Sequence, residues 1–169
     1  MKVNYILPYL IILLTFPSNF SFAQKIDTES LYESLEWNFV GPYRGGRSTT
    51  AAGLDSKPYT FFMGTTGGGV WKTNDAGNTW NNVSDGQITA GSIGAIAISP
   101  SDENIIYVGT GSADPRGNIS SGNGMYKSTD FGENWEFIGL PRAGLIGKIS
   151  IHPENSDIVY VAALGDIFG

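Results

Sequence analysis

The sequence predicts an all-β fold built from repeated units of four antiparallel strands. Residues 93–108 and 146–161 align without gaps at an offset of 53, and residues 70–80 and 125–135 align at an offset of 55. The composition agrees, because 23 glycines and 12% aromatic residues suit tight turns and short strands. A repeat of this length, filled with short strand-like runs, is typical of the blades of a β-propeller.

The strands of each unit follow from short apolar or β-branched runs separated by turn residues. In the first unit we expect strands near residues 47–53, 59–65, 69–73 and 79–83. In the second unit we expect them at residues 93–99, 105–109, 124–128 and 135–139. A third unit begins with strands near Ile146 and Ile158, and its third strand is not reached by Gly169.

The chain is therefore expected to hold about two and a half blades: blade 1 at about 46–84, blade 2 at about 92–140 and the start of blade 3 at about 146–169. Propellers close with about four to eight blades, and an open array exposes its faces, so we expect an N-terminal fragment of a larger ring. Residues 35–41 resemble the fourth strand of a blade and are the expected closing strand. The remaining blades of the same protein would then be its partners.

The first 23 residues have the order of a secretory signal peptide. Lys2 precedes an apolar run from Tyr5 to Phe16, and small residues at Ser21 and Ala23 form a cleavage site. The run is about 12 residues, short of the ~20 that a membrane-spanning helix needs, which disfavours an uncleaved anchor. We expect cleavage near Ala23, a linker at 24–34, no membrane span in the mature part, and a secreted or cell-envelope location in the periplasm or at the cell surface.

Composition also limits the chemistry. The absence of Cys excludes disulfides, thiol catalysis and cysteine-ligated metals, and a single His leaves little room for a His-based metal site. The net charge of −6, without a Lys/Arg cluster, argues against a nucleic-acid partner. We expect no cofactor and no metal.

A turn motif of the form Ser/Thr-x-Asp-x-Gly-x-Thr/Asn-Trp occurs once in each of the first two units. Its aspartate can accept hydrogen bonds from the turn that it begins, its glycine permits a positive φ, and its tryptophan covers the turn. The eight motif residues are Thr73, Asp75, Gly77, Trp80, Ser128, Asp130, Gly132 and Trp135. One carboxylate per turn is too few for calcium, which takes 6–8 oxygen ligands.

This motif resembles the Asp-box of BNR-repeat proteins, and the chain from about residue 36 onward resembles secreted, sortilin-like BNR propellers, including bacterial proteins often named glycosyl hydrolases. The resemblance implies that the Asp-box residues stabilise turns at the blade periphery, away from any active site. It does not establish an activity.

Three enzyme types require residues that this sequence can be checked for. Tyr43-Arg44 matches only half of the Phe/Tyr-Arg-Ile-Pro run of sialidases. The stretch 64–72 is similar to xyloglucan-cleaving propellers, whose catalytic Asp position here is Thr66. A Ser–His–Asp hydrolase would need His152, for which a role in entering a turn is the competing interpretation. Catalytic residues therefore stay unknown.

Four residues are candidates for binding: Arg44, Arg47, Asp114 and Arg116. The first two precede the first inner strand and can face the central channel, unless they only satisfy loop carbonyls. The other two lie in the insertion 112–123, which is either a binding loop or an ordinary surface loop. We expect a binding or scaffold module for an extracellular or envelope protein, peptide or glycan. The alternative is a sialidase-like or xyloglucanase-like glycoside hydrolase whose remaining catalytic residues lie in missing blades, opposite Asp114 or Asp166.

Overall fold

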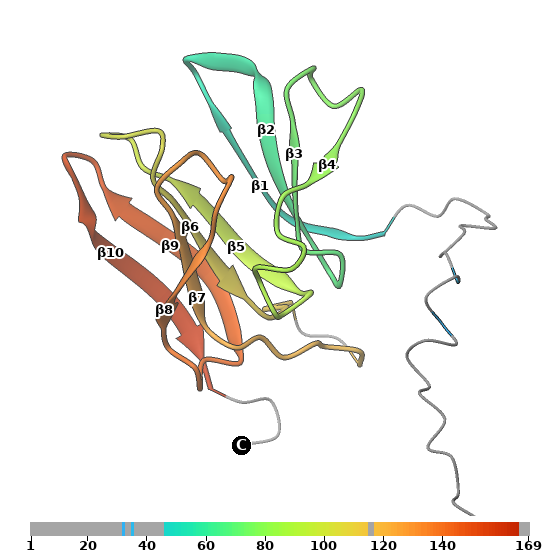
Figure 1. Cartoon of the computed structure of the whole chain (residues 1–169). Helices are drawn as coiled ribbons and strands as arrows, with labels where there is room; N and C mark the ends of the chain where they lie inside the picture. The colour runs from blue at the N-terminus through green and yellow to red at the C-terminus, as the bar shows by residue number, and fades with distance from the viewer. Residues whose placement is uncertain (1–31, 33–34, 36–45, 115–116, 166–169) are drawn as a thin grey trace, which may run out of the picture. The chain divides into compact units, whose positions relative to one another are not determined.

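The computed structural model describes residues 32, 35, 46–114 and 117–165, and the chain divides into two units, Met1–Pro42 and Tyr43–Gly169. All the strands among the described residues belong to the second unit (Figure 1). The expected signal peptide lies outside the described residues, as does the expected closing strand apart from Leu35. Within the described residues, no helix has the length and apolar character needed to cross a membrane.

The second unit consists of three antiparallel sheets. The first sheet contains β1 (Ser48–Leu54), β2 (Lys57–Thr65), β3 (Val70–Thr73) and β4 (Asn81–Asn82), in that order. The second contains β5 (Ile93–Ile98), β6 (Ile106–Thr110), β7 (Met125–Ser128) and β8 (Glu136–Gly139), also in sequence order. The third pairs β9 (Leu145–His152) with β10 (Asn155–Leu164). The predicted fold, blades of four antiparallel strands with a third one begun, is confirmed.

The fourth strand of blade 1 is shorter than the run 79–83 suggests. Only Asn81 and Asn82 pair with β3. Thr79 instead bonds to Asp75 through both its backbone N–H, at 2.9 Å, and its hydroxyl, at 2.7 Å. The turn motif therefore keeps Thr79 out of the strand, and β4 begins at Asn81 as β8 begins at the equivalent Glu136.

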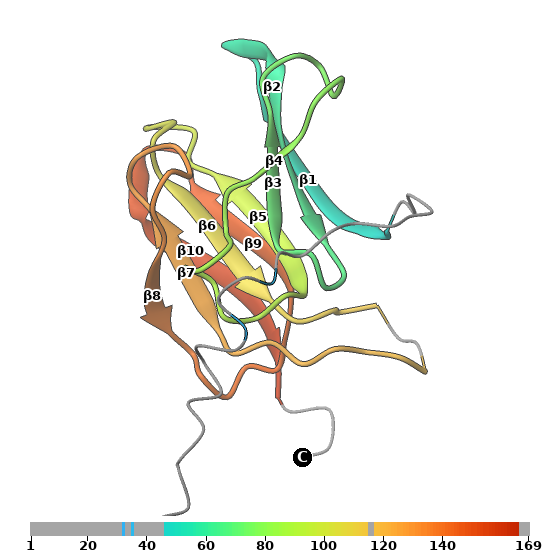
Figure 2. The same cartoon turned by 45° about the vertical axis from the view of Figure 1, so that its right-hand side comes forward.

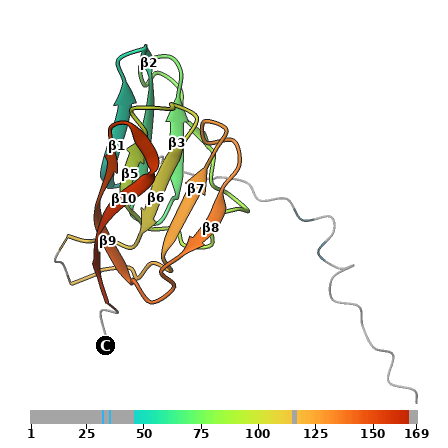
Figure 3. The same ribbon diagram turned by 90° about the vertical axis from the view of Figure 1, so that its left-hand side faces the viewer.

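The core lies between successive sheets. Figures 2 and 3 show the sheets stacked face to face, with β5 against β1 and β2, and β9 against β5 and β6. The cluster between blades 1 and 2 contains Phe62, Val70, Ile88, Ile93, Ile96, Ile106, Val108, Tyr126 and Trp135. The cluster between blade 2 and the β9–β10 pair contains Ala95, Tyr107, Met125, Ile146 and Ile149. Each blade is thus stabilised mainly by its neighbours, as expected for a repeat architecture.

A glycine in the second strand of each full blade allows this close stacking. A Cβ added at Gly64 would lie 2.7 Å from Cγ2 of Ile93, which starts β5. A Cβ added at Gly109 would meet Cγ2 of Ile146, the corresponding residue of β9. Both isoleucines are fully buried, so the glycines make room for the first strand of the next blade.

Candidate functional site

The two turns that carry the Ser/Thr-x-Asp-x-Gly-x-Thr/Asn-Trp motif lie between β3 and β4 and between β7 and β8. In the first, Asp75 accepts hydrogen bonds from Thr79 and from the Thr73 hydroxyl, the latter at 2.7 Å. These bonds, those from Thr79 above all, lower the pKa of Asp75 to about 2. Ala76 and Gly77 have φ of 59° and 92°, so the backbone is left-handed where the motif places its glycine.

The second turn repeats this geometry. Asp130 accepts bonds from Asn134 through Nδ2 at 2.7 Å and N at 2.8 Å, and from the Ser128 hydroxyl at 2.8 Å. The bonds from Asn134 contribute most to lowering the pKa of Asp130 to about 2. Both carboxylates are occupied by their own turns, which is the arrangement that a turn-stabilising role requires.

The tryptophans that end the two motifs have different surroundings. Trp135 is 8% exposed, and its indole Nε1 donates to the Val83 carbonyl of the preceding blade at 2.8 Å. Trp80 is half-buried, and its Nε1 donates locally to the Gly77 carbonyl at 3.1 Å. Trp135 therefore joins two blades, a role that the motif alone did not indicate.

His152 is the last residue of β9, at the entry to the turn that leads to β10. Its Nδ1 accepts a hydrogen bond from the backbone N–H of Glu154 at 3.2 Å. Ser99, the aligned residue of the previous blade, accepts similar bonds from the N–H groups of Ser101 and Asp102, both at 3.3 Å. This matches the turn interpretation rather than a catalytic triad.

A polar cleft lies near the end of β3 that is farther from the turn motif, where the β2–β3 turn is. Its cavity, about 320 Å³, is lined by Gly46, Arg47, Ser48, Thr49, Thr66, Ser112 and Asp114. Arg47 precedes β1, Thr66 lies in the β2–β3 turn, and Asp114 comes from the long β6–β7 connection. The fold thus brings together Arg47 and Asp114, two of the four candidate binding residues, beside Thr66. The other two, Arg44 and Arg116, lie outside the described residues.

Two backbone hydrogen bonds and one side-chain hydrogen bond hold the three segments of this cleft in place. The Thr66 N–H donates to the Arg47 carbonyl at 3.1 Å, which fixes the β2–β3 turn against the start of β1. The Arg47 guanidinium reaches Asn118 Oδ1 at 3.4 Å, in the same loop as Asp114. The Gly111 N–H donates to the Ser92 carbonyl at 2.8 Å and anchors the start of that loop.

The lining groups suit a ligand rich in hydroxyls. Arg47 supplies only donors, Asp114 only acceptors, and the Ser and Thr hydroxyls can do both. The one Arg and one Asp offset each other in charge. Asp114 is the only carboxylate among the described residues that line the cleft, whereas glycoside hydrolysis generally uses a pair. No group of three or more His, Asp or Glu residues in the described part of the chain is placed to hold a metal ion.

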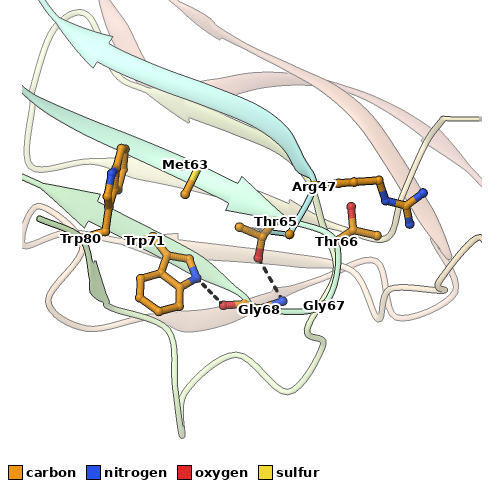
Figure 4. Close-up of a pocket in the computed structure, with 9 residues that line it drawn as sticks. Arg47, Met63, Thr65, Thr66, Gly67, Gly68, Trp71 and Trp80 are labelled. Atoms are coloured by element: carbon orange, nitrogen blue, oxygen red, sulfur yellow. Dashed lines mark hydrogen bonds between the residues drawn. The ribbon is translucent and has the colours of Figure 1, made fainter. Parts of the chain in front are cut away.

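A second, apolar cavity of about 490 Å³ adjoins the polar cleft and shares Gly46, Arg47 and Thr66 with it. Figure 4 shows Trp71 and Trp80 near Met63, with Arg47 and Thr66 at the other end. The Trp71 indole donates to the Gly68 carbonyl at 2.7 Å, which ties this aromatic wall to the β2–β3 turn.

Comparison with known proteins finds partial similarities to three longer proteins. No family model matches the chain. A curated protein of Neosartorya fischeri, a probable oligoxyloglucan-reducing end-specific xyloglucanase, is 35% identical over 85 residues, which are 48% of this chain and 9% of that protein. An ancestral GH74 enzyme is 20% identical with a TM-score of 0.54, over 68% of this chain and 16% of that one. The GH74 xyloglucanase of Xanthomonas campestris is also 20% identical, with a TM-score of 0.52 over 75% and 20% of the two chains.

The chain therefore spans a tenth to a fifth of the lengths of these proteins. The likeness to these solved structures, at 20% identity, supports the predicted β-propeller fold. The finer likeness to sortilins and BNR proteins stays a prediction.

Proposed function

We propose that the chain contributes a glycan-binding cleft to a glycoside-hydrolase-like propeller, and that the glycan is a neutral, xyloglucan-type oligosaccharide. The observation that carries this proposal is the meeting of Arg47, Thr66 and Asp114 in one polar cavity, built from three segments distant in sequence. The names of the relatives supply the substrate class, and the cleft chemistry is compatible with it.

The charge of the cleft favours a neutral sugar over a sialic acid. A sialidase site binds the substrate carboxylate with several arginines, whereas the described residues that line this cleft include one arginine, Arg47, and one aspartate, Asp114. A carboxylate ligand would meet repulsion from Asp114. A neutral pyranose can accept hydrogen bonds from the guanidinium and donate them to the carboxylate at the same time.

In this proposal Asp114 is one carboxylate of the pair that hydrolysis needs, either as the acid or as the base. Thr66 occupies the position at which the xyloglucanase resemblance expects an aspartate, so this part of the chain would bind the sugar without cleaving it. Cleavage by the whole protein requires a second carboxylate from outside the described cleft. Export through residues 1–23, as the sequence predicts, would expose the cleft to extracellular polysaccharide.

Calorimetric titration of the chain with xyloglucan oligosaccharides tests the proposal. We expect binding that weakens at least about tenfold in Arg47→Ala and in Asp114→Ala, because each loses a hydrogen bond to a charged group, worth about 1.5–3 kcal/mol. Arg142→Ala, an exposed arginine that does not line the cleft, is the matched control and should bind normally. Folded protein that binds no oligosaccharide at millimolar concentration, or that prefers sialyllactose, would contradict the proposal.

Reducing-end release from the same oligosaccharides tests catalysis separately. We expect no turnover by this chain alone. Turnover that Asp114→Asn leaves unchanged would show that the reacting carboxylates lie elsewhere. The scaffold interpretation, with a protein or peptide partner, gains support only if sugar binding is absent.

A further inference from the structure

The short β2–β3 turn of blade 1 and the long β6–β7 connection of blade 2 are closed by the same hydrogen bonds. In blade 1 the Thr65 hydroxyl accepts from the N–H of Gly68 at 2.9 Å and donates to the carbonyl of the following residue at 3.1 Å. In blade 2 the Thr110 hydroxyl accepts from the N–H of Asn123 at 2.8 Å and donates to the carbonyl of the following residue, also at 2.8 Å. Asn123 therefore stands where blade 1 has Gly68.

The bonds from these connections to the next sheet are repeated as well. The N–H of Gly67 donates to the Gly91 carbonyl at 3.0 Å, and the N–H of Gly122 donates to the Gly144 carbonyl at 2.6 Å. Gly91 and Gly144 are equivalent at the repeat offset of 53. The residues that lengthen the blade 2 connection are therefore 112–121, and the hydrogen bonds of the tight turn remain beneath them.

The side chain of Asn123, the last residue of the insertion 112–123, makes contacts that a glycine cannot make. Its Nδ2 donates to the Thr89 hydroxyl at 2.5 Å and to the Tyr126 hydroxyl at 3.0 Å, and these two hydroxyls lie 3.1 Å apart. Tyr126 is 4% exposed, so its hydroxyl is held by a buried ring. In blade 1 the equivalent Trp71 donates its indole N–H to the Gly68 carbonyl instead. Asn123 thus joins the end of the insertion to β7 and to the segment before β5.

From this anchor the described part of the insertion reaches the polar cleft. The N–H of Ser112 donates to the Ser120 carbonyl at 3.0 Å, which ties the two limbs of the insertion together. Asp114 lies two residues beyond Ser112 and lines the cleft, and Asn118 accepts a hydrogen bond from the Arg47 guanidinium at 3.4 Å. The position of Asp114 relative to Arg47 therefore depends on how firmly the base of the insertion is held.

We propose that Asn123 is a positioning residue for the polar cleft. Its side chain, held by Thr89 and Tyr126, fixes the base of the insertion so that Asp114 lines the cleft before a ligand binds. Such preorganisation raises affinity because the loop is ordered on folding rather than on binding. The tight turn of blade 1 has no long loop to orient, and its equivalent position is a glycine. This inference rests on the function proposed above, because it specifies what holds that site in shape.

Amide hydrogen exchange followed by NMR tests the positioning without any ligand. In Asn123→Ala we expect the N–H groups of Ser112 and Gly122 to exchange about two- to tenfold faster, the factor that corresponds to the net contribution of a hydrogen bond. Tyr126→Phe keeps the buried ring and removes one of the two hydroxyls, so it should have a smaller effect of the same kind. The double variant should add little to Asn123→Ala, because both changes remove the same contact.

Tyr107→Phe is the matched control. Tyr107 is also 4% exposed, and its hydroxyl donates to the Ser156 carbonyl at 2.9 Å, in the third sheet and away from the insertion. Its loss should lower stability in the same way as the loss of the Tyr126 hydroxyl. It should leave the exchange of the Ser112 and Gly122 amides unchanged.

Calorimetric titration of the same variants with xyloglucan oligosaccharides tests the consequence for the cleft. We expect Asn123→Ala to bind about two- to tenfold more weakly than the unchanged chain, and Tyr107→Phe to bind equally well. Asn123→Asp should restore most of the affinity and the amide protection, because its carboxylate can accept from the hydroxyls of Thr89 and Tyr126. A general loss of stability would not be rescued in this way.

Folded Asn123→Ala protein whose insertion exchanges as in the unchanged chain would overturn the proposal. So would faster exchange with the same affinity for the sugar. Tyr126→Phe provides the same test if Asn123→Ala does not fold. If the unchanged chain binds no sugar, the function proposed above fails, and the exchange measurement alone decides the role of Asn123.

Discussion

The different surroundings of Trp80 and Trp135, which end the two turn motifs, predict different losses of stability for the same substitution. Trp135→Ala removes a ring that is 8% exposed and packed between blades, together with the hydrogen bond to Val83. Truncation of a buried Trp costs about 3–5 kcal/mol. Trp80 is half-buried and its indole bonds within its own turn, so Trp80→Ala should cost about half as much, ~1.5–2.5 kcal/mol, because less apolar area returns to water.

Urea unfolding followed by far-UV circular dichroism measures both costs. All variants are compared with the unchanged chain at the same protein concentration. Trp135→Phe is the control that keeps an aromatic ring but loses the indole N–H, and it should fall between Trp135→Ala and the parent. Equal losses at the two positions, or a loss below about 0.5 kcal/mol for Trp135→Ala, would refute the assignment of Trp135 as the residue that joins the blades.

Two further predictions concern packing and pH. Gly109→Val should destabilise the chain by about 1–3 kcal/mol because the new side chain overlaps Ile146, whereas Gly117→Ala, with open space around it, should be nearly neutral in the same urea titration. Because the pKa values of Asp75 and Asp130 are lowered to about 2 from 3.8, both carboxylates stabilise the fold above about pH 4, and this stability is lost as the pH falls toward 2. A chain with Asp75→Asn and Asp130→Asn should be less stable at pH 7 and lose less on acidification; an unchanged acid profile would contradict the role of these turns.

The sequence was sufficient for the fold because the repeat carries the information twice. A strand that is ambiguous in one unit is defined by its aligned partner in the other, as with residues 93–98 and 146–151. Contacts across blades have no such signal. The burial of Trp135 against Val83, and the space that Gly109 leaves for Ile146, depend on how far one sheet is rotated over the next, which no local pattern encodes.

For the candidate site too, the sequence identified individual residues but not their arrangement in space. Arg47 and Asp114 were both identified, one from its place before the first inner strand and the other from its place in an insertion. Their position in one cleft could not be deduced, because it depends on how a loop returns from β6 to β7. The sequence singles out Thr66 only because the resemblance to xyloglucan-cleaving propellers expects an aspartate at this position. The structure shows that Thr66 lines the same cleft.

The larger of the two adjoining cavities is the weaker candidate for the sugar. Two tryptophans beside a polar cleft would ordinarily suggest a stacking platform for pyranose rings. Here, however, the residues equivalent to Trp71 and Trp80 are Tyr126 and Trp135, and both are buried between blades. A side-chain set that serves sheet packing in one repeat is best explained by sheet packing in the other. The proposed glycan site is therefore the polar cleft, whose contributors from the β6–β7 insertion have no counterpart in the short β2–β3 turn of blade 1.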